Sequence, residues 1–65
     1  MSHETPKALR LRLKVSQTAA AAEARMAPNT YRVAELCREA VSEENQAKLD
    51  AFVARLRERL AREVA

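Results

Sequence analysis

The chain has 65 residues, no glycine, one cysteine and one histidine, which excludes an internal disulfide, a zinc site and glycine-rich nucleotide-binding loops. Its formal net charge is +3; residues 1–33 hold six basic and two acidic side chains, whereas residues 34–65 hold six and seven. This asymmetry predicts a polyanion partner for the first half, and the small size predicts oligomerisation as a source of stability.

The first helix is expected to follow a disordered segment of residues 1–4. Thr5 followed by Pro6 is typical of a helix start, with the hydroxyl as cap and proline in the first turn. Residues 8–15 also alternate apolar and basic side chains without exception, which is the pattern of a half-buried strand. Helix and strand therefore both stay open for this segment, and the helix would leave Leu11 on the wrong face.

Two further helices are predicted in the middle of the chain. Ser16 caps a helix that includes a run of four alanines and reaches about Met26. Proline disfavours a helical conformation of the preceding residue, so Pro28 marks a boundary and starts a third helix that reaches about Val41. Cys37 falls in the apolar stripe of this helix, and we interpret it as a small core residue and not as a nucleophile.

A long amphipathic helix is predicted at about 43–64, after a polar break in which Ser42 is the cap. Its apolar residues recur about every 3.5 positions, which suits a seam between helices. They are Leu49, Phe52, Val53, Leu56 and Leu60. The stripe has two interpretations, packing against its own domain and a dimer interface. The small monomer core favours the second, so residues 42–65 are predicted to form a dimerisation helix.

Residues 6–36 carry a pattern of helix starts and small residues. The segments are Leu9-Arg10-x-Arg12-Leu13, Ser16-Gln17, Ala20-Ala21 and Met26-Ala27-Pro28-Asn29-Thr30-Tyr31-Arg32, with Glu35 following. This pattern resembles the helix-turn-helix domains of phage repressors and Cro proteins. The family's interior positions fall on residues that are all apolar: Ala20, Ala21, Ala24, Met26, Tyr31 and Ala34. The resemblance implies an all-α fold in which residues 5–41 form a DNA-binding region.

The resemblance also implies DNA contacts for a set of polar residues. They are Asn29, Thr30, Arg32, Gln17, Arg25 and Lys14. In this family the third helix is the recognition helix, which enters the major groove of DNA. Asn29 and Arg32, near its start, would pair with adenine and guanine edges there. Gln17 matches a position that hydrogen-bonds a phosphate oxygen, and Arg25 and Lys14 would neutralise phosphates.

The chain departs from the family's pattern in three respects. Arg25 stands where the family usually has glycine, and it would be strained if its φ were positive. Ala27 replaces the usual capping serine. Val33 and Leu36 fall on the groove-facing side, where Val33 could touch a thymine methyl group.

The strand alternative for residues 8–15 resembles a second family, the ribbon-helix-helix repressors and antitoxins. In that family two N-terminal strands pair into a ribbon that lies in the major groove. The base-reading residues would then be Arg10, Arg12 and Lys14. Only about ten residues separate Val15 from Met26, roughly one helical turn less than that family's usual first helix. A plain helical hairpin is the third possibility.

Both families imply a small dimeric, sequence-specific DNA-binding regulator, such as a phage or plasmid repressor. The alternative is a helical dimer that binds a partner protein through residues 43–64, as an antitoxin or inhibitor. Neither function is enzymatic, and we expect no cofactor, metal or small-molecule substrate. No stretch approaches the roughly 18 apolar residues of a membrane span, and no signal peptide is apparent. We therefore expect a cytoplasmic protein with no membrane partner.

Overall fold

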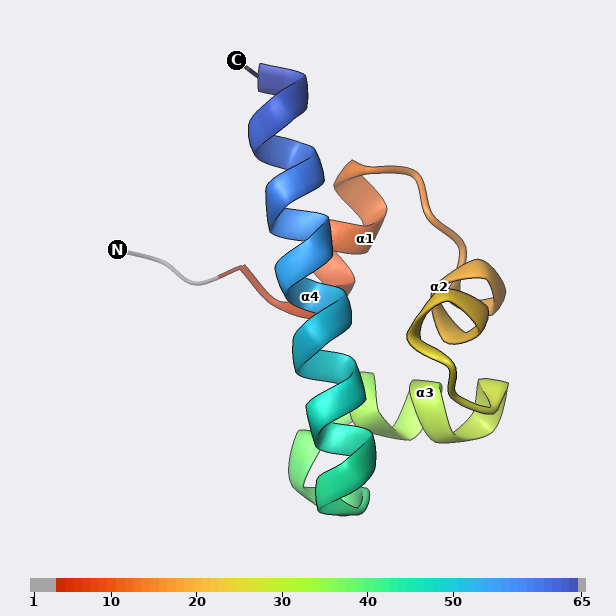
Figure 1. The fold of residues 1–65 in the computed structure, drawn as a ribbon. Helices are drawn as coiled ribbons and strands as arrows, with labels where there is room; N and C mark the ends of the chain where they lie inside the picture. Colours follow the sequence, from red (N-terminus) through yellow and green to blue (C-terminus); the bar gives the residue numbers. More distant parts are fainter. Residues whose placement is uncertain (1–3, 65) are drawn as a thin grey trace.

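Helices account for most of the part that the computed structural model describes, residues 4–64 (Figure 1). In chain order they are α1 (Pro6–Arg12), α2 (Gln17–Ala24), α3 (Pro28–Leu36), the 3-10 turn η1 (Arg38–Ala40) and α4 (Glu43–Val64). The described chain contains no strand, so the predicted all-α class is confirmed and the alternative strand over residues 8–15 is wrong. In the same part of the chain, no helix combines the length and the apolar character needed to cross a bilayer.

α1 begins as its capping residues predict. The Thr5 hydroxyl accepts a hydrogen bond from the Ala8 amide at 3.1 Å, and Pro6 occupies the first turn, where its missing N–H leaves no bond unmade. The helix buries Leu9 and leaves Leu11 57% exposed. The alternating pattern therefore leaves one apolar residue, Leu11, on the solvent side of the helix, as the helical alternative predicted. Capping and the burial of one face outweigh this cost.

α2 begins and ends for local reasons. The Ser16 hydroxyl accepts a hydrogen bond from the Ala19 amide at 3.1 Å. The helix ends at Ala24, before the predicted end at Met26, because Arg25 adopts a left-handed conformation with φ 61° and ψ 45°. This conformation brings the Cβ atom of a non-glycine residue close to the following carbonyl group. The position that matches the family's glycine is therefore strained in this chain.

Replacing Arg25 by glycine is expected to raise the free energy of unfolding by about 0.5–1 kcal/mol. The left-handed conformation costs a residue with a Cβ atom about 1–2 kcal/mol, and the greater freedom of glycine in the unfolded chain offsets part of the gain. Urea unfolding followed by circular dichroism measures the change. Arg25→Ala is the matched control, since it removes the same charge but keeps the Cβ atom. Equal stabilities of the two variants would reject strain as the cause.

α3 begins at Pro28 as predicted but ends at Leu36, earlier than the predicted end at Val41. Cys37 leaves the helix with an extended backbone (φ −150°, ψ 98°), and η1 then turns the chain towards α4. Cys37 is consequently exposed, and its Sγ atom donates to the Glu39 carboxylate at 3.7 Å. The expectation that Cys37 is a core residue is wrong, because it assumed that helical spacing continued past residue 36.

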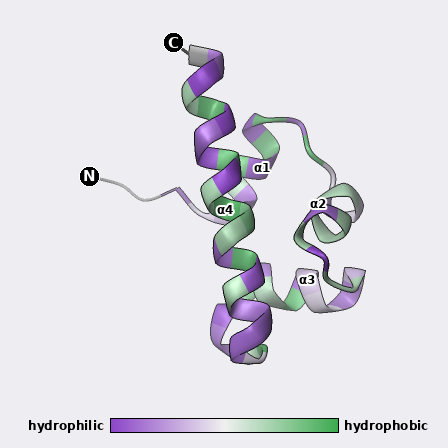
Figure 2. Cartoon of the chain, in the orientation of Figure 1, coloured by the Kyte–Doolittle hydropathy of each residue, from purple (hydrophilic) through white to green (hydrophobic). Residues whose placement is uncertain are grey.

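α4 contacts each of the other three α-helices. The Ser42 hydroxyl caps it by accepting a hydrogen bond from the Asn45 amide at 3.2 Å. Apolar and polar residues alternate along it, and its apolar side helps to form the core (Figure 2). The buried apolar residues of the described chain are Leu9, Ala20, Ala21, Ala24, Met26, Tyr31, Ala34, Leu49, Phe52, Val53 and Leu56. They include all six positions that the family resemblance placed in the interior.

The apolar stripe of α4 faces the core of its own chain. Leu49, Phe52, Val53 and Leu56 are each at most 7% exposed, and Leu60 is partly buried against the same core. Of the two interpretations of the stripe, packing against its own domain is the one observed. The prediction of a dimer seam is corrected accordingly, because the first four side chains have almost no surface to offer to a second copy.

Candidate nucleic-acid interface

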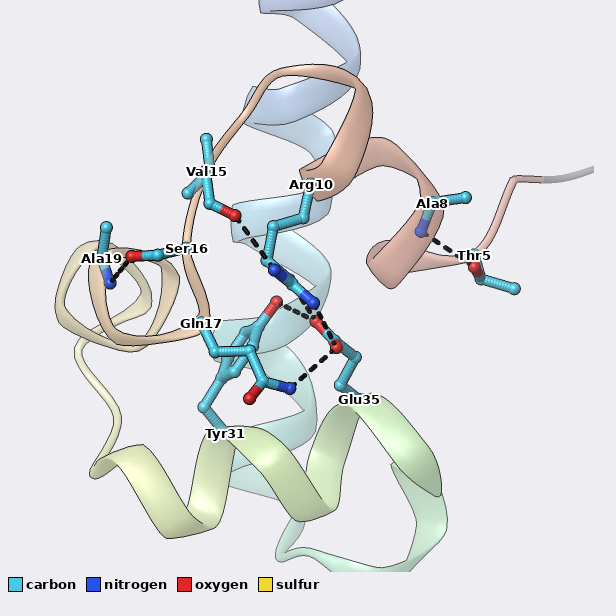
Figure 3. Close-up of polar contacts among 9 residues, drawn as sticks. All are labelled: Thr5, Ala8, Arg10, Val15, Ser16, Gln17, Ala19, Tyr31 and Glu35. Carbon is cyan, nitrogen blue, oxygen red and sulfur yellow. Dashed lines mark hydrogen bonds and ion pairs between the residues drawn. The ribbon is translucent and has the colours of Figure 1, made fainter.

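A buried polar network fixes α3 against the first half of the chain (Figure 3). Arg10 of α1 and Glu35 of α3 form a bidentate ion pair, with Nε–Oε2 at 3.0 Å and Nη2–Oε1 at 3.1 Å. Tyr31 donates its hydroxyl to the same carboxylate at 2.6 Å, and the Gln17 amide nitrogen donates to it at 3.2 Å. Arg10 also donates to the Val15 carbonyl group at 3.0 Å. One carboxylate thus holds side chains from α1, α2 and α3 together.

The network keeps Glu35 charged although the side chain is only 4% exposed. Burial alone would raise the pKa of this carboxyl group, but the hydrogen bonds from its neighbours, that of Arg10 foremost, hold the pKa below its ordinary value of 4.5. Burial, followed by the hydrogen bond to Glu35, raises the pKa of Tyr31, which stays a neutral donor. No buried side-chain nitrogen or oxygen in the described residues lacks a partner, so the network is fully satisfied.

The network corrects the roles that the ribbon alternative assigned to two arginines. Arg10 is buried and engaged, so it cannot read a base. Arg12 pairs at 2.6 Å with Glu4 on the surface. Glu4 belongs to the segment expected to be disordered; the rest of that segment, residues 1–3, lies outside the described residues. Lys14, the third residue of the ribbon set, is exposed in the turn after α1 and has a positive φ of 58°.

Gln17 lies at the start of α2, as predicted, but its side chain takes part in the network. One amide N–H is donated to Glu35, and an amide nitrogen has two such donors. The predicted hydrogen bond to a phosphate would therefore use the second N–H of the same nitrogen. This geometry ties the candidate phosphate contact to the position of α3.

α3 has one buried side and one exposed side. Tyr31 and Ala34 are buried, and the Tyr31 ring meets Phe52 of α4 edge-on, with ring centroids 5.9 Å apart and planes at 85°. Thr30 is half-buried. The exposed residues that share the outer side at helical spacing are Asn29, Arg32, Val33 and Leu36. Two of the three predicted α3 contact residues thus face outwards together, and the third lies at the edge of this side.

The start of α3 has no side-chain cap. Ala27 occupies the N-cap position and forms no capping hydrogen bond, as its departure from the family's serine predicted. The turn between α2 and α3 consists of residues 25–27 and carries the exposed Arg25. Lys48 of α4 donates to the Arg25 carbonyl group at 3.3 Å and so connects this turn to the long helix.

Basic side chains divide into those with and those without an acidic partner. Within residues 4–64, the ion-paired ones are Arg10, Arg12, Arg38, Lys48, Arg59 and Arg62. In the same range no carboxylate forms an ion pair with Lys14, Arg25 or Arg32, and all three are exposed on or next to α2 and α3. These three side chains are therefore available to an external anion.

The central feature missed from the sequence is the Arg10–Glu35 pair. Its signal was present: an acidic residue lies one turn after the interior Tyr31 on the buried side of the predicted helix. A carboxylate at such a position requires a buried cationic partner.

No group of three or more histidine, cysteine or acidic side chains in the described residues is arranged to hold a metal ion.

Comparisons with protein-family models, with curated proteins and with solved structures found no match. The features relevant to function are the outer side of α3, the free basic side chains beside it and the buried network behind it.

Proposed function

We propose that the chain is a sequence-specific regulator that binds double-stranded DNA, with α2 and α3 acting as a helix-turn-helix unit. The observation that carries this proposal is the outer side of α3, where Asn29 and Arg32 are exposed together. Asparagine and arginine have the donors and acceptors that match adenine and guanine edges in the major groove. A helix anchored on its inner side and free on its outer side is suited to lie in that groove.

The packing of α2 against α3 supports the same proposal. The turn between them has three residues, and the buried Ala20, Ala21 and Ala24 allow the two helices to approach closely. The two helices contact each other directly. A recognition helix needs this kind of rigid support, because its side chains must meet base edges in a fixed register.

The distribution of charge supports a polyanionic ligand. Three of the basic side chains without an ion pair lie along this part of the chain: Lys14 between α1 and α2, Arg25 between α2 and α3, and Arg32 on α3. Contacts between basic side chains and phosphate groups add affinity but do not distinguish one base sequence from another. The proposal places Lys14 and Arg25 on phosphates and Arg32 on a base edge.

The predicted homodimer remains part of the proposal, and two copies related by symmetry would bind a palindromic DNA site. The dimer needs contacts other than the buried stripe of α4. The alternative function, capture of a partner protein by the apolar side of residues 43–64, loses support for the same reason. That side is already occupied by the chain's own core. We therefore retain DNA binding, in the cytoplasm, as the single proposed function.

Selection from a randomised DNA duplex library tests the proposal. We expect enrichment of a defined sequence, and a binding constant for that duplex that falls steeply as salt rises, with a slope of about −0.9 for each phosphate contacted. Fluorescence anisotropy of the labelled duplex measures this slope. Failure to enrich any sequence, together with no binding to duplex DNA at low salt, would reject the proposed function.

Arg32→Ala is expected to weaken binding to the selected duplex by about 1–3 kcal/mol and to relax its sequence preference, because a base-reading side chain is lost. The exposed position of Arg32 should leave the fold intact. Arg57→Ala is the matched control, since Arg57 is an exposed arginine of α4 for which residues 4–64 provide no ion pair. Unchanged sequence preference in Arg32→Ala, measured by anisotropy, would remove Arg32 from the base-reading set.

A further inference from the structure

Two large apolar residues lie on the exposed side of α3. Val33 is 41% exposed and Leu36 is 82% exposed. In the described part of the chain, Leu11 of α1 is the only other large apolar residue in the exposed class. Single surface apolar residues are common, but these two share the side of α3 that carries Asn29 and Arg32.

The position of Val33 relative to the polar contact residues is fixed by helical geometry. It follows Arg32 directly and lies four residues after Asn29, which is one turn of the helix. Four residues rise about 6 Å along an α-helix, and successive base pairs are about 3.4 Å apart. With α3 lying along the groove, Val33 is therefore about two base pairs beyond Asn29 and less than one base pair beyond Arg32.

Val33 is accessible from outside the domain. It borders an open hollow of about 360 Å³ that it shares with Asn29, Thr30, Val41 and Asn45, among others. The residues that face this hollow from η1 and α4 do not cover the valine, which keeps 41% of its surface exposed. Its β-branched side chain has one strongly preferred rotamer in a helix, so its two methyl groups occupy a defined place.

The chemistry of the major groove determines what a valine can recognise there. Base edges present donors and acceptors, which valine cannot pair with, and one apolar group, the C5-methyl group of thymine. We propose that Val33 reads a thymine methyl group next to the base pairs contacted by Asn29 and Arg32. This inference rests on the proposed DNA binding and adds a specific requirement for thymine. Leu36 is not assigned this role, because it lies almost one turn further than Val33 from the start of α3, which enters the groove.

Replacement of thymine by uracil tests the proposal, because it removes the methyl group and leaves every hydrogen-bonding group in place. The probes are the duplex selected from the randomised library and versions of it with uracil at one thymine at a time. Loss of a buried methyl contact should weaken binding of the native chain roughly fourfold at one position. Val33→Ala should bind the thymine and uracil duplexes equally. Leu11→Ala, which truncates an exposed leucine of α1, should keep the fourfold difference.

Two results would overturn the proposal while leaving DNA binding intact. The first is equal binding of the native chain to the selected duplex and to every uracil version. The second is a Val33→Ala variant that keeps the preference for thymine. Circular dichroism of this variant establishes that it is folded, as the exposure of Val33 leads us to expect. Failure to select any duplex would instead reject the proposed function.

Discussion

Replacing Glu35 by alanine is expected to lower the free energy of unfolding by about 3–5 kcal/mol, which is the usual cost of breaking a buried ion pair. The change leaves the Arg10 guanidinium buried at 7% exposure without a counter-charge. It also removes the acceptor of the Tyr31 hydroxyl and of the Gln17 amide. Because single domains are stable by only about 5–15 kcal/mol and small ones lie at the low end, the variant should keep only a small part of its stability and unfold at much lower urea concentration. Urea unfolding followed by circular dichroism measures the loss.

A double variant separates the effect of the unpaired charge on stability from the effect of the lost side-chain volume. Arg10→Met combined with Glu35→Leu replaces both charged side chains by apolar side chains of roughly similar volume. Such replacements are often neutral or stabilising, so we expect the double variant to be far more stable than Glu35→Ala. It loses the contacts to Tyr31 and Gln17, however, and should therefore hold α3 less firmly. A double variant as unstable as Glu35→Ala would show that the unpaired charge of Arg10 is not the cause of the loss.

The pH dependence of stability provides a second control. A carboxyl group whose pKa is lowered on folding stabilises the fold fully above its unfolded pKa, and that stabilisation disappears as the pH falls through the folded pKa. The pKa of Glu35 is lowered from 4.5 by its hydrogen bonds, although burial opposes this. The stability difference between the native chain and Glu35→Gln should therefore be constant above about pH 5 and shrink below pH 4.5. A difference that stays constant down to lower pH would contradict this role.

The starts of the helices were predictable because each depends on residues that are adjacent in the chain. Thr5 with Pro6, Ser16, Pro28 and Ser42 all mark the observed starts. Caps act through hydrogen bonds to the next three residues, so the sequence alone contains the necessary information. The same reasoning failed for the end of α3, where an extended Cys37 precedes η1. The residues around position 37 include no proline or glycine, so the local sequence contains no signal for that end.

The exposed residues of the candidate site could be predicted from the sequence, but the buried network behind them could not. The exposed Asn29 and Arg32 follow from helical spacing once the start of α3 is known. The pair between Arg10 and Glu35 joins residues 25 positions apart, and spacing within one helix cannot reveal a partner on another. The ribbon alternative therefore places Arg10 on DNA, whereas its side chain is buried and paired with Glu35. Periodicity shows which side of a helix is apolar but does not show what covers that side.

The stripe of α4 illustrates this last point, and Leu56→Asp tests it. Because Leu56 is fully buried in its own chain, the variant is expected to unfold, with a loss of about 5 kcal/mol or more. Removing a buried leucine side chain costs about 2–5 kcal/mol, and an unpaired carboxylate in an apolar core adds to that cost. Small-angle scattering measures the outcome directly. The radius of gyration should rise from near the folded value of 11.3 Å towards roughly 24 Å, the value for an unfolded chain of this length.

A seam between two copies that each fold alone would respond differently at Leu56, since dissociation would leave each copy folded. In that case the mass in sedimentation would halve while the circular dichroism spectrum kept its helical form. Ala54→Asp is the matched control, because it places the same charge on the exposed side of the same helix, two residues earlier, and should cost less than about 1 kcal/mol. A folded monomeric Leu56→Asp variant would require the core itself to rearrange around a carboxylate. The loss of helix in Leu56→Asp alone would instead establish that α4 holds its own chain together.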